Sequence, residues 1–343
     1  MNSPAITAAL QRALSLAEQA IGLTDPNPRV GCVILAADGR ELGAGHTQPA
    51  GQAHAEVMAL RDAAARGHDV RGATAVVTLE PCSHHGRTPP CCDALIAAGI
   101  ARVVAAVKDP NPQVAGQGLA RLKAAGLQVE LADAAVAEAA SELNIGFFSR
   151  MQRGRPFVRL KSAISLDGRT ALPDGRSQWI TSEAARTDGH AWRKRAGAVL
   201  TGIGTVLADD PRLDVRLVPT ARQPLRIVLD PQGRMPGSAR ILQPPGEARV
   251  IGPGRADLAV LLAELGAQGI NELHVEAGPT LSGAFLNAGL VDELLIYQAP
   301  MLIGEGRPLA ALSPLAELGD ARRWRLVEAT PVGQDLRLRL RPR

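Results

Sequence analysis

The chain contains 343 residues, of which 46% are hydrophobic, 21% are charged and only 2% are aromatic. This composition is typical of a globular protein and excludes a largely disordered one. Because domains usually contain roughly 100 to 200 residues, the length predicts two hydrophobic cores. The sequence has no run of roughly 18 apolar residues and does not begin with a basic, apolar leader, so we expect no membrane partner and a cytoplasmic location.

Charge is divided unevenly between the two halves of the chain. Residues 1–150 carry 12 Lys and Arg against 14 Asp and Glu, a net charge of −2, and the remaining residues carry 26 against 20, a net charge of +6. An acidic first half suits a polyphosphate backbone poorly, whereas a moderately basic second half suits small phosphorylated ligands. We therefore expect a small-molecule substrate and no nucleic acid partner.

The first half alternates between helical and strand patterns. Apolar residues at helical spacing predict a helix over 5–20, and a short apolar run that ends at a turn predicts a strand over 30–35. The same signals then predict a helix over 55–66, a strand over 73–79, a helix over 91–98 and a strand over 102–107. This alternation predicts a layered α/β domain over residues 1–147.

Glycine, arginine and proline interrupt the periodicity over 144–156, and a second domain is expected over 155–343. Its predicted elements are strands over 157–163, 198–202, 225–229, 249–252, 272–276 and 293–298, and a helix over 182–196. Near the end, strands over 324–327 and 336–340 flank a turn and predict an antiparallel hairpin. We interpret the arginines that alternate along this hairpin as a solvated face of the sheet.

His54, Glu56, Cys82 and Cys91 form the most specific pattern in the sequence. His54 and Glu56 lie at the start of one predicted helix, Cys82 follows a predicted strand, and Cys91 begins the next predicted helix. One imidazole and two thiolates would give zinc three protein ligands and leave a position for a water, whose pKa zinc lowers to about 7. Glu56 would then carry a proton from that water to a departing ammonia, which is the chemistry of a zinc deaminase.

Two other interpretations of this pattern stay open. A structural zinc site would need a fourth ligand such as Cys92 or His84, although Cys92 lies about 100° around a helix from Cys91. A deaminase that acts on a base in tRNA or single-stranded nucleic acid would need a basic, aromatic-rich surface beside the zinc, which this first half does not offer. We interpret Cys32 and Cys92 as packing residues.

The segment EPCSHHGRTPPC, from Glu80 to Cys91, spaces its cysteines more widely than the Pro-Cys-x-x-Cys of many zinc deaminases. Together with NP at Asn27 and DPNP at Asp109, it resembles the bifunctional riboflavin-biosynthesis deaminase/reductase family. Further blocks of the resemblance are KSAISLDG from Lys161, SQWIT from Ser177, TVLADDP from Thr205 and EAGPT from Glu276. The resemblance covers nearly the whole chain, with both halves in the family's order.

For the first domain, the resemblance implies a cytidine-deaminase-like fold of α/β/α layers. The implied reaction is hydrolysis of the 2-amino group of a diaminohydroxypyrimidine that carries a phosphoribosylamino group. Zn²⁺ would be bound by His54, Cys82 and Cys91, and Glu56 would be the catalytic proton carrier. The implied substrate contacts are Asn27, His46, His84, Arg87, Asp109 and Asn111. A guanidinium suits phosphate recognition at Arg87, and a solvated loop charge is the competing interpretation.

For the second domain, the resemblance implies a dihydrofolate-reductase-like α/β fold that uses NADPH to reduce the ribosyl group of the deaminated product to a ribityl chain. The implied NADPH contacts are Ala163, Trp179, Thr205, Asp209, Gly278, Pro279, Thr280, Leu281, Ser282, Gly283 and Ala284. The implied substrate contacts are Ser177, Arg193, Leu213, Arg216 and Glu276, with Arg193 and Arg216 as phosphate ligands.

The segment from Gly278 to Gly283 also has a chemistry of its own. It follows a predicted strand and begins a predicted helix, so its backbone N–H groups and the helix dipole can receive pyrophosphate oxygens. A structural turn is the competing interpretation there, as are a core aromatic for Trp179 and a helix cap for Asp209. No side chain stands out as an acid, so we expect direct hydride transfer to C1′ of an opened, imine-like ribose. We also expect a homo-oligomer.

Overall fold

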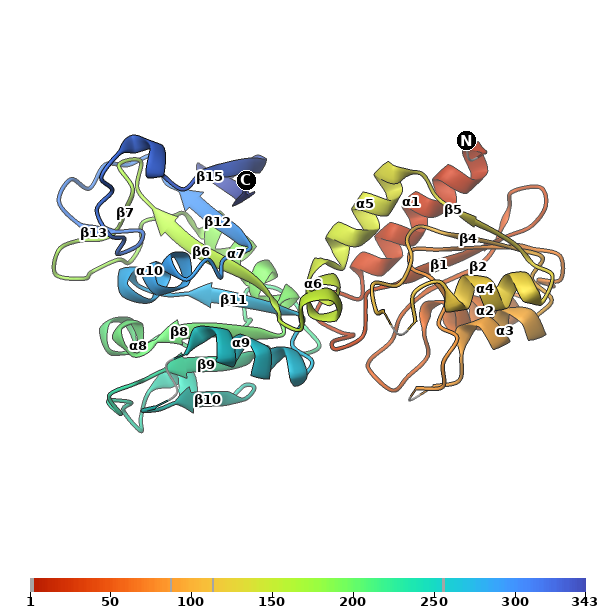
Figure 1. Cartoon of the computed structure of the whole chain (residues 1–343), viewed down its shortest axis with the longest axis horizontal. Coiled ribbons are helices and arrows are strands. Elements are labelled where there is room, and N and C mark those ends of the chain that lie inside the picture. The colour runs from red at the N-terminus through yellow and green to blue at the C-terminus, as the bar shows by residue number, and fades with distance from the viewer. Residues whose placement is uncertain (1–2, 87, 113, 255–256) are drawn as a thin grey trace. The chain divides into compact units, whose positions relative to one another are not determined.

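The computed structural model describes residues 3–86, 88–112, 114–254 and 257–343. The chain separates into two compact units, Met1–Gly154 and Arg155–Arg343, which Figure 1 colours from red to yellow-green and from green to blue. Each unit has its own sheet. Among the described residues, no helix combines the length and the apolar character that crossing a bilayer requires.

The first unit is built on a five-stranded sheet in the order β2-β1-β3-β4-β5. The strands are β1 (Gly31–Leu35), β2 (Glu41–His46), β3 (Thr74–Val77), β4 (Arg102–Ala105) and β5 (Gln128–Leu131). Strand β1 runs antiparallel to both β2 and β3, whereas β3, β4 and β5 are parallel. The parallel strands therefore end at one common edge.

In the described part of this unit, the helices that accompany the sheet are α1 (Pro4–Glu18), α2 (Ala55–Ala65), α3 (Cys91–Ala97), α4 (Gln117–Ala124), α5 (Ala134–Leu143) and α6 (Ile145–Arg153). Successive side chains of a strand point to opposite faces. Cys32 and Ile34 of β1 consequently pack with α2, α3 and α4, and Val33 and Leu35 pack with α1 and α5. Figure 1 shows helices on both faces of the sheet, and the predicted α/β/α layering is confirmed.

Two glycines of β2 bring α2 close to the sheet. A Cβ atom at Gly43 would lie 2.3 Å from the carbonyl oxygen of Ala59, and one at Gly45 would lie 2.8 Å from the amide nitrogen of the same residue. Real Cβ atoms do not come so close, so only glycine permits this packing. The contact holds α2 close to the sheet, and α2 has His54 as its N-cap residue and Glu56 in its first turn.

The second unit contains an eight-stranded sheet in the order β10-β9-β8-β11-β6-β12-β15-β14. The strands are β6 (Phe157–Ile164), β8 (Ala198–Gly202), β9 (Leu225–Leu229), β10 (Ala248–Ile251), β11 (Glu272–Glu276), β12 (Glu293–Gln298), β14 (Trp324–Val332) and β15 (Asp335–Pro342). The six strands from β10 to β12 are parallel, and β15 and β14 are antiparallel to them. A separate pair joins β7 (Arg169–Ala171) to β13 (Arg307–Pro308).

Helices cover both faces of this second sheet. They are α7 (Glu183–Arg195), α8 (Ile203–Asp209), α9 (Leu258–Ala267) and α10 (Pro279–Asn287), with 3-10 turns at Arg240–Leu242 and Leu318–Asp320. Leu262 of α9 and Phe285 of α10 pack into one apolar cluster with Val158 of β6, whereas Val206 of α8 packs into another with Val199 of β8. The predicted α/β fold and its antiparallel C-terminal hairpin are both confirmed.

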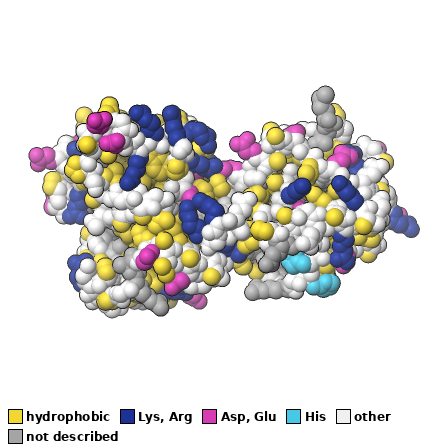
Figure 2. All heavy atoms as spheres, in the orientation of Figure 1, with side chains coloured by type: hydrophobic (Ala, Val, Ile, Leu, Met, Phe, Trp, Pro, Cys, Tyr) yellow, Lys and Arg dark blue, Asp and Glu magenta, His cyan; other side chains and the backbone are white. Residues whose placement is uncertain are grey.

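The arginines of β15 do not form the solvated face that the alternation suggested. Arg337, Arg339 and Arg341 have only 16%, 12% and 19% of their side chains exposed. Arg339 and Arg341 pair with Glu293, and the guanidinium groups of Arg337 and Arg339 lie over the ring of Trp192. Figure 2 shows Lys and Arg side chains gathered where Figure 1 places β15. Because carboxylates neutralise these charges within the unit, they are poorly available to an external polyanion.

Candidate functional site

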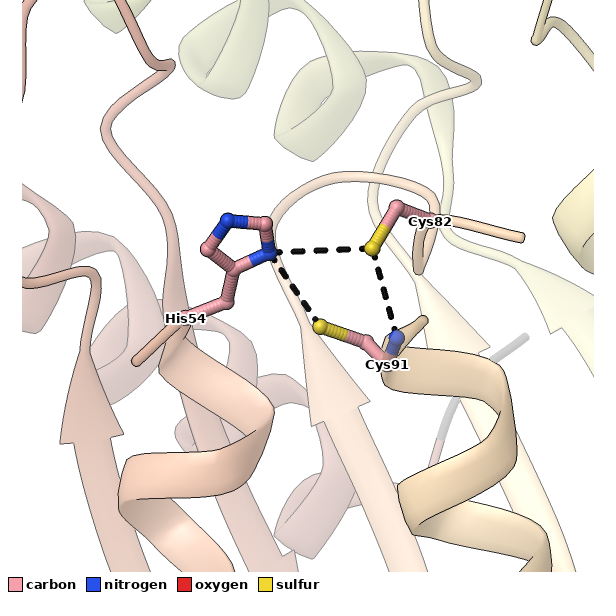
Figure 3. A group of neighbouring side chains, drawn as sticks. All are labelled: His54, Cys82 and Cys91. Atoms are coloured by element: carbon pink, nitrogen blue, oxygen red, sulfur yellow. Dashed lines mark hydrogen bonds between the residues drawn. The ribbon is translucent and has the colours of Figure 1, made fainter. Parts of the chain in front are cut away.

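Three potential metal ligands converge in the first unit. His54 is the N-cap residue of α2, Cys91 is the first residue of α3, and Cys82 lies in the segment between β3 and α3. One ligand atom from each residue lies within 4.8 Å of the other two. The His54 Nδ1 atom is 3.6 Å from the Cys82 sulfur and 3.3 Å from the Cys91 sulfur, and Figure 3 shows all three groups turned toward a common point.

These separations fit a zinc ion. Tetrahedral zinc has metal–sulfur distances of about 2.3 Å and metal–nitrogen distances of about 2.0 to 2.1 Å, which place its ligand atoms roughly 3.5 to 3.8 Å apart. One imidazole and two thiols are also the donor types that zinc prefers. The residues thus fit the metal in both chemistry and spacing.

A fourth protein ligand is not part of this cluster within the described residues. The Cys92 sulfur lies 3.3 Å from the carbonyl oxygen of Pro81 and 3.5 Å from that of Gly118, so its thiol donates away from the metal ligands. His84 is exposed in the loop that follows Cys82. Three ligands with one open position are the arrangement of a catalytic zinc site rather than a structural one.

The Glu56 carboxyl group is buried beside the two sulfurs. Burial is the main cause that raises its pKa to about 7, and the negative charge of Cys82 adds to the effect. A hydrogen bond with the Cys91 side chain and the charge of His54 act in the opposite direction without cancelling it. A carboxyl group whose pKa lies near neutrality can both accept and release a proton, which is the requirement for a proton carrier.

Cys82 is the more acidic of the two thiols. The hydrogen bond from the Cys91 thiol is the main cause that lowers the pKa of Cys82 to about 4, with help from His54 and from the Cys91 amide. That amide nitrogen lies 3.3 Å from the Cys82 sulfur. A thiolate is the form that binds a metal, so the first turn of α3 prepares Cys82 for coordination.

The structure places the expected substrate contacts of the first unit on separate segments. Asn27 lies in the turn after α1, His46 ends β2, and Asp109 and Asn111 lie in the loop after β4. Burial raises the pKa of Asp109. The Asp109 amide lies 3.1 Å from a carboxylate oxygen of Glu80, two residues before Cys82, so the Asp109 loop lies near the metal ligands. Arg87 lies outside the described residues.

Two residues near the metal ligands were not anticipated from the sequence. The Thr88 hydroxyl oxygen lies 3.5 Å from Nε2 of His54, the ring nitrogen that does not face the sulfurs. Glu80 is buried directly before Pro81 and Cys82 and accepts backbone hydrogen bonds from the loop after β4. A glutamate at the end of an apolar strand was the available signal for Glu80.

The second unit contains a cavity of about 1020 Å³ at the carboxyl ends of its parallel strands. Open α/β sheets bind their ligands at this edge. The cavity is lined by nearly all of the residues that the resemblance implied for NADPH and substrate: Ala163, Ser177, Trp179, Arg193, Thr205, Asp209, Leu213, Arg216, Glu276, Gly278, Pro279, Thr280, Leu281 and Ala284. The structure therefore brings together residues that the sequence distributes from position 163 to position 284.

Ser282 and Gly283 are not among the residues that line this cavity. The Ser282 hydroxyl donates to the carbonyl oxygen of Ala277, 3.2 Å away. A Cβ atom at Gly283 would lie 2.1 Å from the carbonyl oxygen of Ala311. Both residues thus lie on the packed face of α10 and shape the helix position rather than the cavity wall.

Two helix N-termini meet at the cavity. Gly278 is the N-cap residue of α10, and a Cβ atom there would lie 3.9 Å from the hydroxyl oxygen of Thr205 in α8. The first intrahelical bond of α10 runs from the Ser282 amide to the Gly278 carbonyl, so the preceding amides of Thr280 and Leu281 have no acceptor within the helix. Such N–H groups, at the positive end of the helix dipole, suit phosphate oxygens.

The phosphate assignment of Arg193 meets a competing partner in the structure. Its guanidinium pairs with the Glu276 carboxylate through two nitrogens and also donates to the Asp214 carbonyl oxygen, 3.2 Å away. Lys161 lies 3.7 Å from the same carboxylate. A bidentate pair of this kind is strong, so a phosphate would have to compete with Glu276 for Arg193.

Arg216 is held from two sides. One guanidinium nitrogen lies 2.5 Å from a carboxylate oxygen of buried Asp214, and the Arg216 amide donates to Nδ1 of His190 at 3.1 Å. Leu213, which directly precedes Asp214, is buried and has a positive φ of 52°. The sequence did not identify His190, because its partner Arg216 lies 26 positions away and becomes a neighbour only on folding. It also did not identify Asp214, which pairs with Arg212 and Arg216 two positions away on the same segment.

Trp179 and Asp209 differ from their competing interpretations. Trp179 is 65% exposed at the cavity and lies against the Arg186 guanidinium, 4.5 Å from the ring centre, so it is not a core aromatic. Asp209 is the last residue of α8 and Asp210 is the C-cap, so neither caps a helix N-terminus. Both Trp179 and Asp209 are placed where a ligand in the cavity would meet them.

Comparisons with known proteins cover both units. The family model described as RibD C-terminal domain matches residues 156–338, and the cytidine and deoxycytidylate deaminase zinc-binding region matches residues 4–107. The riboflavin biosynthesis protein RibD of Escherichia coli (strain K12) is 50% identical over 364 residues, covering 96% of this chain and 98% of that protein. RibD of Mycobacterium tuberculosis is 44% identical over 98% of this chain and 97% of that protein.

Solved structures agree with the sequence relatives. Acinetobacter baumannii RibD superimposes with a TM-score of 0.92 at 44% identity and covers 99% of both chains. A diaminohydroxyphosphoribosylaminopyrimidine deaminase/5-amino-6-(5-phosphoribosylamino)uracil reductase from Thermotoga maritima superimposes with a TM-score of 0.90 at 33% identity over the same share of each chain. The similarity thus extends through both units in the same order.

Proposed function

Because this chain belongs to the RibD family, we propose that its two sites act in sequence, with His54, Cys82, Cys91 and Glu56 serving the first reaction. The chain is a bifunctional enzyme of riboflavin biosynthesis. It removes the 2-amino group of 2,5-diamino-6-(5-phosphoribosylamino)pyrimidin-4(3H)-one by zinc-dependent hydrolysis, and it reduces the ribosyl group of the product to a ribityl chain with NADPH.

The convergence of His54, Cys82 and Cys91 beside a buried Glu56 is the single observation that carries the proposed roles. Zinc held by these three residues supplies a Lewis acid that makes water a nucleophile near neutral pH. Glu56 would accept a proton from the attacking water on its carboxylate and would later donate it to the leaving amine. Its burial beside the metal ligands favours a carboxyl group that can take up a proton and release it again.

In the deaminase we propose that the pyrimidine lies against the loop after β4. Asp109 and Asn111 would contact the base, and Asn27, His46 and His84 would complete the wall around it. Arg87 would bind the phosphate, as its family position and its guanidinium chemistry suggest. The hydrogen bond from the Asp109 amide to Glu80, two residues before Cys82, supports the placement of this loop beside the metal ligands.

In the reductase we propose that NADPH occupies the cavity of the second unit and supplies the hydride. The amides at the start of α10 and the Thr205 hydroxyl would bind its phosphates, with further contacts from Ala163, Trp179 and Asp209. We retain Ser282 and Gly283 as residues that position α10, since their side-chain sites pack away from the cavity.

The phosphoribosyl group would lie between α7 and the segment that follows α8. Ser177, Leu213 and Arg216 would contact it, and Arg193 would contact it together with Glu276. The buried Asp214 holds Arg216 in place. We propose that Arg193 exchanges part of its contact with Glu276 for substrate oxygens, because both partners line the same cavity.

We further assign the deaminase to residues 1–147 and the reductase to residues 155–343. A small phosphorylated pyrimidine is the proposed partner, rather than nucleic acid, because the β15 arginines are already paired with carboxylates. We also propose a cytoplasmic location, where a reducing environment would keep the thiols of Cys82 and Cys91 available to zinc. We also propose that the chain associates into a homo-oligomer.

One assay tests the proposal directly. Purified protein is incubated with the diaminopyrimidine phosphate, with and without NADPH, while ammonia and NADPH oxidation are both followed. We expect one equivalent of ammonia in either case and NADPH oxidation only after ammonia has formed. NADPH oxidation without ammonia release, or no ammonia from zinc-replete protein, would contradict the assignment.

A further inference from the structure

The Glu80 carboxylate is surrounded by backbone donors. One oxygen accepts from the amides of Asp109 at 3.1 Å and Gly116 at 2.9 Å, and the other accepts from the amides of Gly118 at 2.9 Å and Leu119 at 3.2 Å. Only 4% of the Glu80 surface is exposed. A buried carboxylate usually needs a counter-ion or several hydrogen bonds, and here four amides fulfil that requirement.

These four amides belong to the loop after β4 and to the first turn of α4, which follows that loop. Asp109 lies near the start of the loop, and Gly118 and Leu119 lie in the first turn of α4. The positive end of the α4 dipole therefore adds to the attraction for the carboxylate. One side chain thus fixes both ends of the loop that carries Asp109 and Asn111, and the Asp109 carboxylate in turn accepts from the Asn111 amide at 2.8 Å.

The backbone of Glu80 lies close in the chain to the metal ligand Cys82. The Glu80 amide donates to the Val107 carbonyl of the segment after β4, and Cys82 follows two residues later. The Cys92 thiol donates to both Pro81 and Gly118, which ties the same two segments together a second time. At Gly118 the loop comes so close that a Cβ atom would lie 2.0 Å from the Pro81 carbonyl oxygen.

We propose that Glu80 is a positioning residue of the deaminase that places the Asp109–Asn111 loop at a defined distance from Cys82. Resting on the proposed contacts of Asp109 and Asn111 with the base, this role concerns how tightly the pyrimidine is held over the metal ligands. A displaced loop would lose contacts that are made equally in the ground state and the transition state, which raises KM and leaves kcat nearly unchanged. Glu80 itself touches neither the substrate nor the metal.

Glu80→Gln provides a selective test because the variant keeps the length of the side chain. An amide has one acceptor oxygen and one donor nitrogen, so in either orientation two of the four backbone donors face an NH₂ group. We expect the KM for the diaminopyrimidine phosphate to rise by about tenfold, which corresponds to the loss of about one hydrogen bond between the displaced loop and the base. We expect kcat to change by less than about threefold. The variant should still bind one zinc per chain, and it should reduce separately prepared deaminated substrate at the wild-type rate.

The matched control is Glu138→Gln, an exposed glutamate on α5 of the same unit, which should retain wild-type KM. Gly118→Ala pushes the loop away from Pro81 while leaving the carboxylate intact, and it should also raise KM. Unchanged KM in Glu80→Gln, or loss of zinc from it, would overturn the positioning role. Failure of the wild-type protein to release ammonia would instead contradict the proposed function.

Discussion

At the scale of single residues, the proposed deaminase centre depends on how burial changes the pKa of the Glu56 carboxyl group. Glu56 is 3% exposed and lies beside two sulfurs, so its proton affinity rises while that of Cys82 falls. The two groups lie close together, yet they differ in the hydrogen bonds that they receive. Cys82 accepts from Cys91, whereas Glu56 lacks enough donors to offset its burial.

Glu56→Gln should abolish ammonia release while leaving zinc bound. The amide keeps the shape of the side chain but cannot carry a proton, and such general-base losses lower rates by about 10² to 10⁴-fold. NADPH-dependent reduction of the separately prepared deaminated substrate should survive. Metal analysis of the purified variant is the check on the role, because loss of zinc with Glu56 would make it a ligand rather than a proton carrier.

Ser177→Ala should give the reverse pattern. Ser177 lines the cavity of the second unit, so its removal should weaken reduction and leave ammonia release at the wild-type rate. The two variants together separate the reactions on one polypeptide. Equal loss of both activities in either variant would argue that the sites do not work independently.

At the scale of elements, the stability and position of helix α7 depend on its N-cap residue, Ser182. The Ser182 hydroxyl accepts from the Ala185 amide at 3.3 Å and donates to a carboxylate oxygen of Asp335 at 2.5 Å. One side chain therefore caps α7 and joins it to the start of β15. The helix carries Arg193 and His190 to the cavity, so its position matters for the reductase.

Ser182→Ala should lower the free energy of unfolding of the second unit by about 1 to 2 kcal/mol, the usual cost of losing an N-cap. All three tryptophans, Trp179, Trp192 and Trp324, lie in this unit, so their fluorescence during urea unfolding reports it alone. Ser238→Ala is the control, since Ser238 is exposed. An equal change in both variants would remove the capping role.

At the scale of the whole molecule, the second unit contains a buried ionic cluster. Arg159, which is 1% exposed, pairs with Glu272 at 2.8 Å and with Glu293 at 2.7 Å. Burial opposes the negative charge of Glu293, but Arg159 and Arg339 outweigh it and hold the pKa of this carboxyl at about 2. Removal of one member would leave a buried charge without its partner.

The depressed pKa of Glu293 has a consequence for stability against pH. Its stabilising effect should be fully present above the ordinary pKa of 4.5 and should disappear as the pH falls toward 2. The shift corresponds to a contribution on the order of 3 kcal/mol. The difference in unfolding free energy between the wild type and Glu293→Gln, followed by tryptophan fluorescence, should narrow across this range. A constant difference would contradict the assigned pKa.

The location of the proposed zinc site in one of the two units predicts how the enzyme responds to metal removal. The three proposed zinc ligands all belong to the first unit, and within the described residues no further cluster of metal-binding side chains is found. Chelation should therefore abolish ammonia release and leave reduction of deaminated substrate unchanged. Stoichiometric zinc should restore the lost activity, and a parallel loss of reduction would indicate that the units depend on each other.

The predicted elements were found where the local pattern was strong. The strand over 30–35 and the helix over 91–98 correspond to β1 and α3 because apolar residues and turn signals agree there. Strand β2 was not predicted because its sequence ELGAGH contains two glycines, which only the contact with α2 explains. Strand β5 was missed because most of its residues are exposed, so it lacks an apolar pattern.

The order of residues by itself determined the deaminase chemistry, since His54, Glu56, Cys82 and Cys91 belong to short motifs whose residue types already select zinc. Only the tertiary structure decided which groups are paired. Glu80 meets amides about 30 to 40 positions away, and Arg193 meets Glu276 across 83 positions. Burial and hydrogen bonding of this kind arise when distant segments pack, and no local pattern encodes the partner that packing will supply.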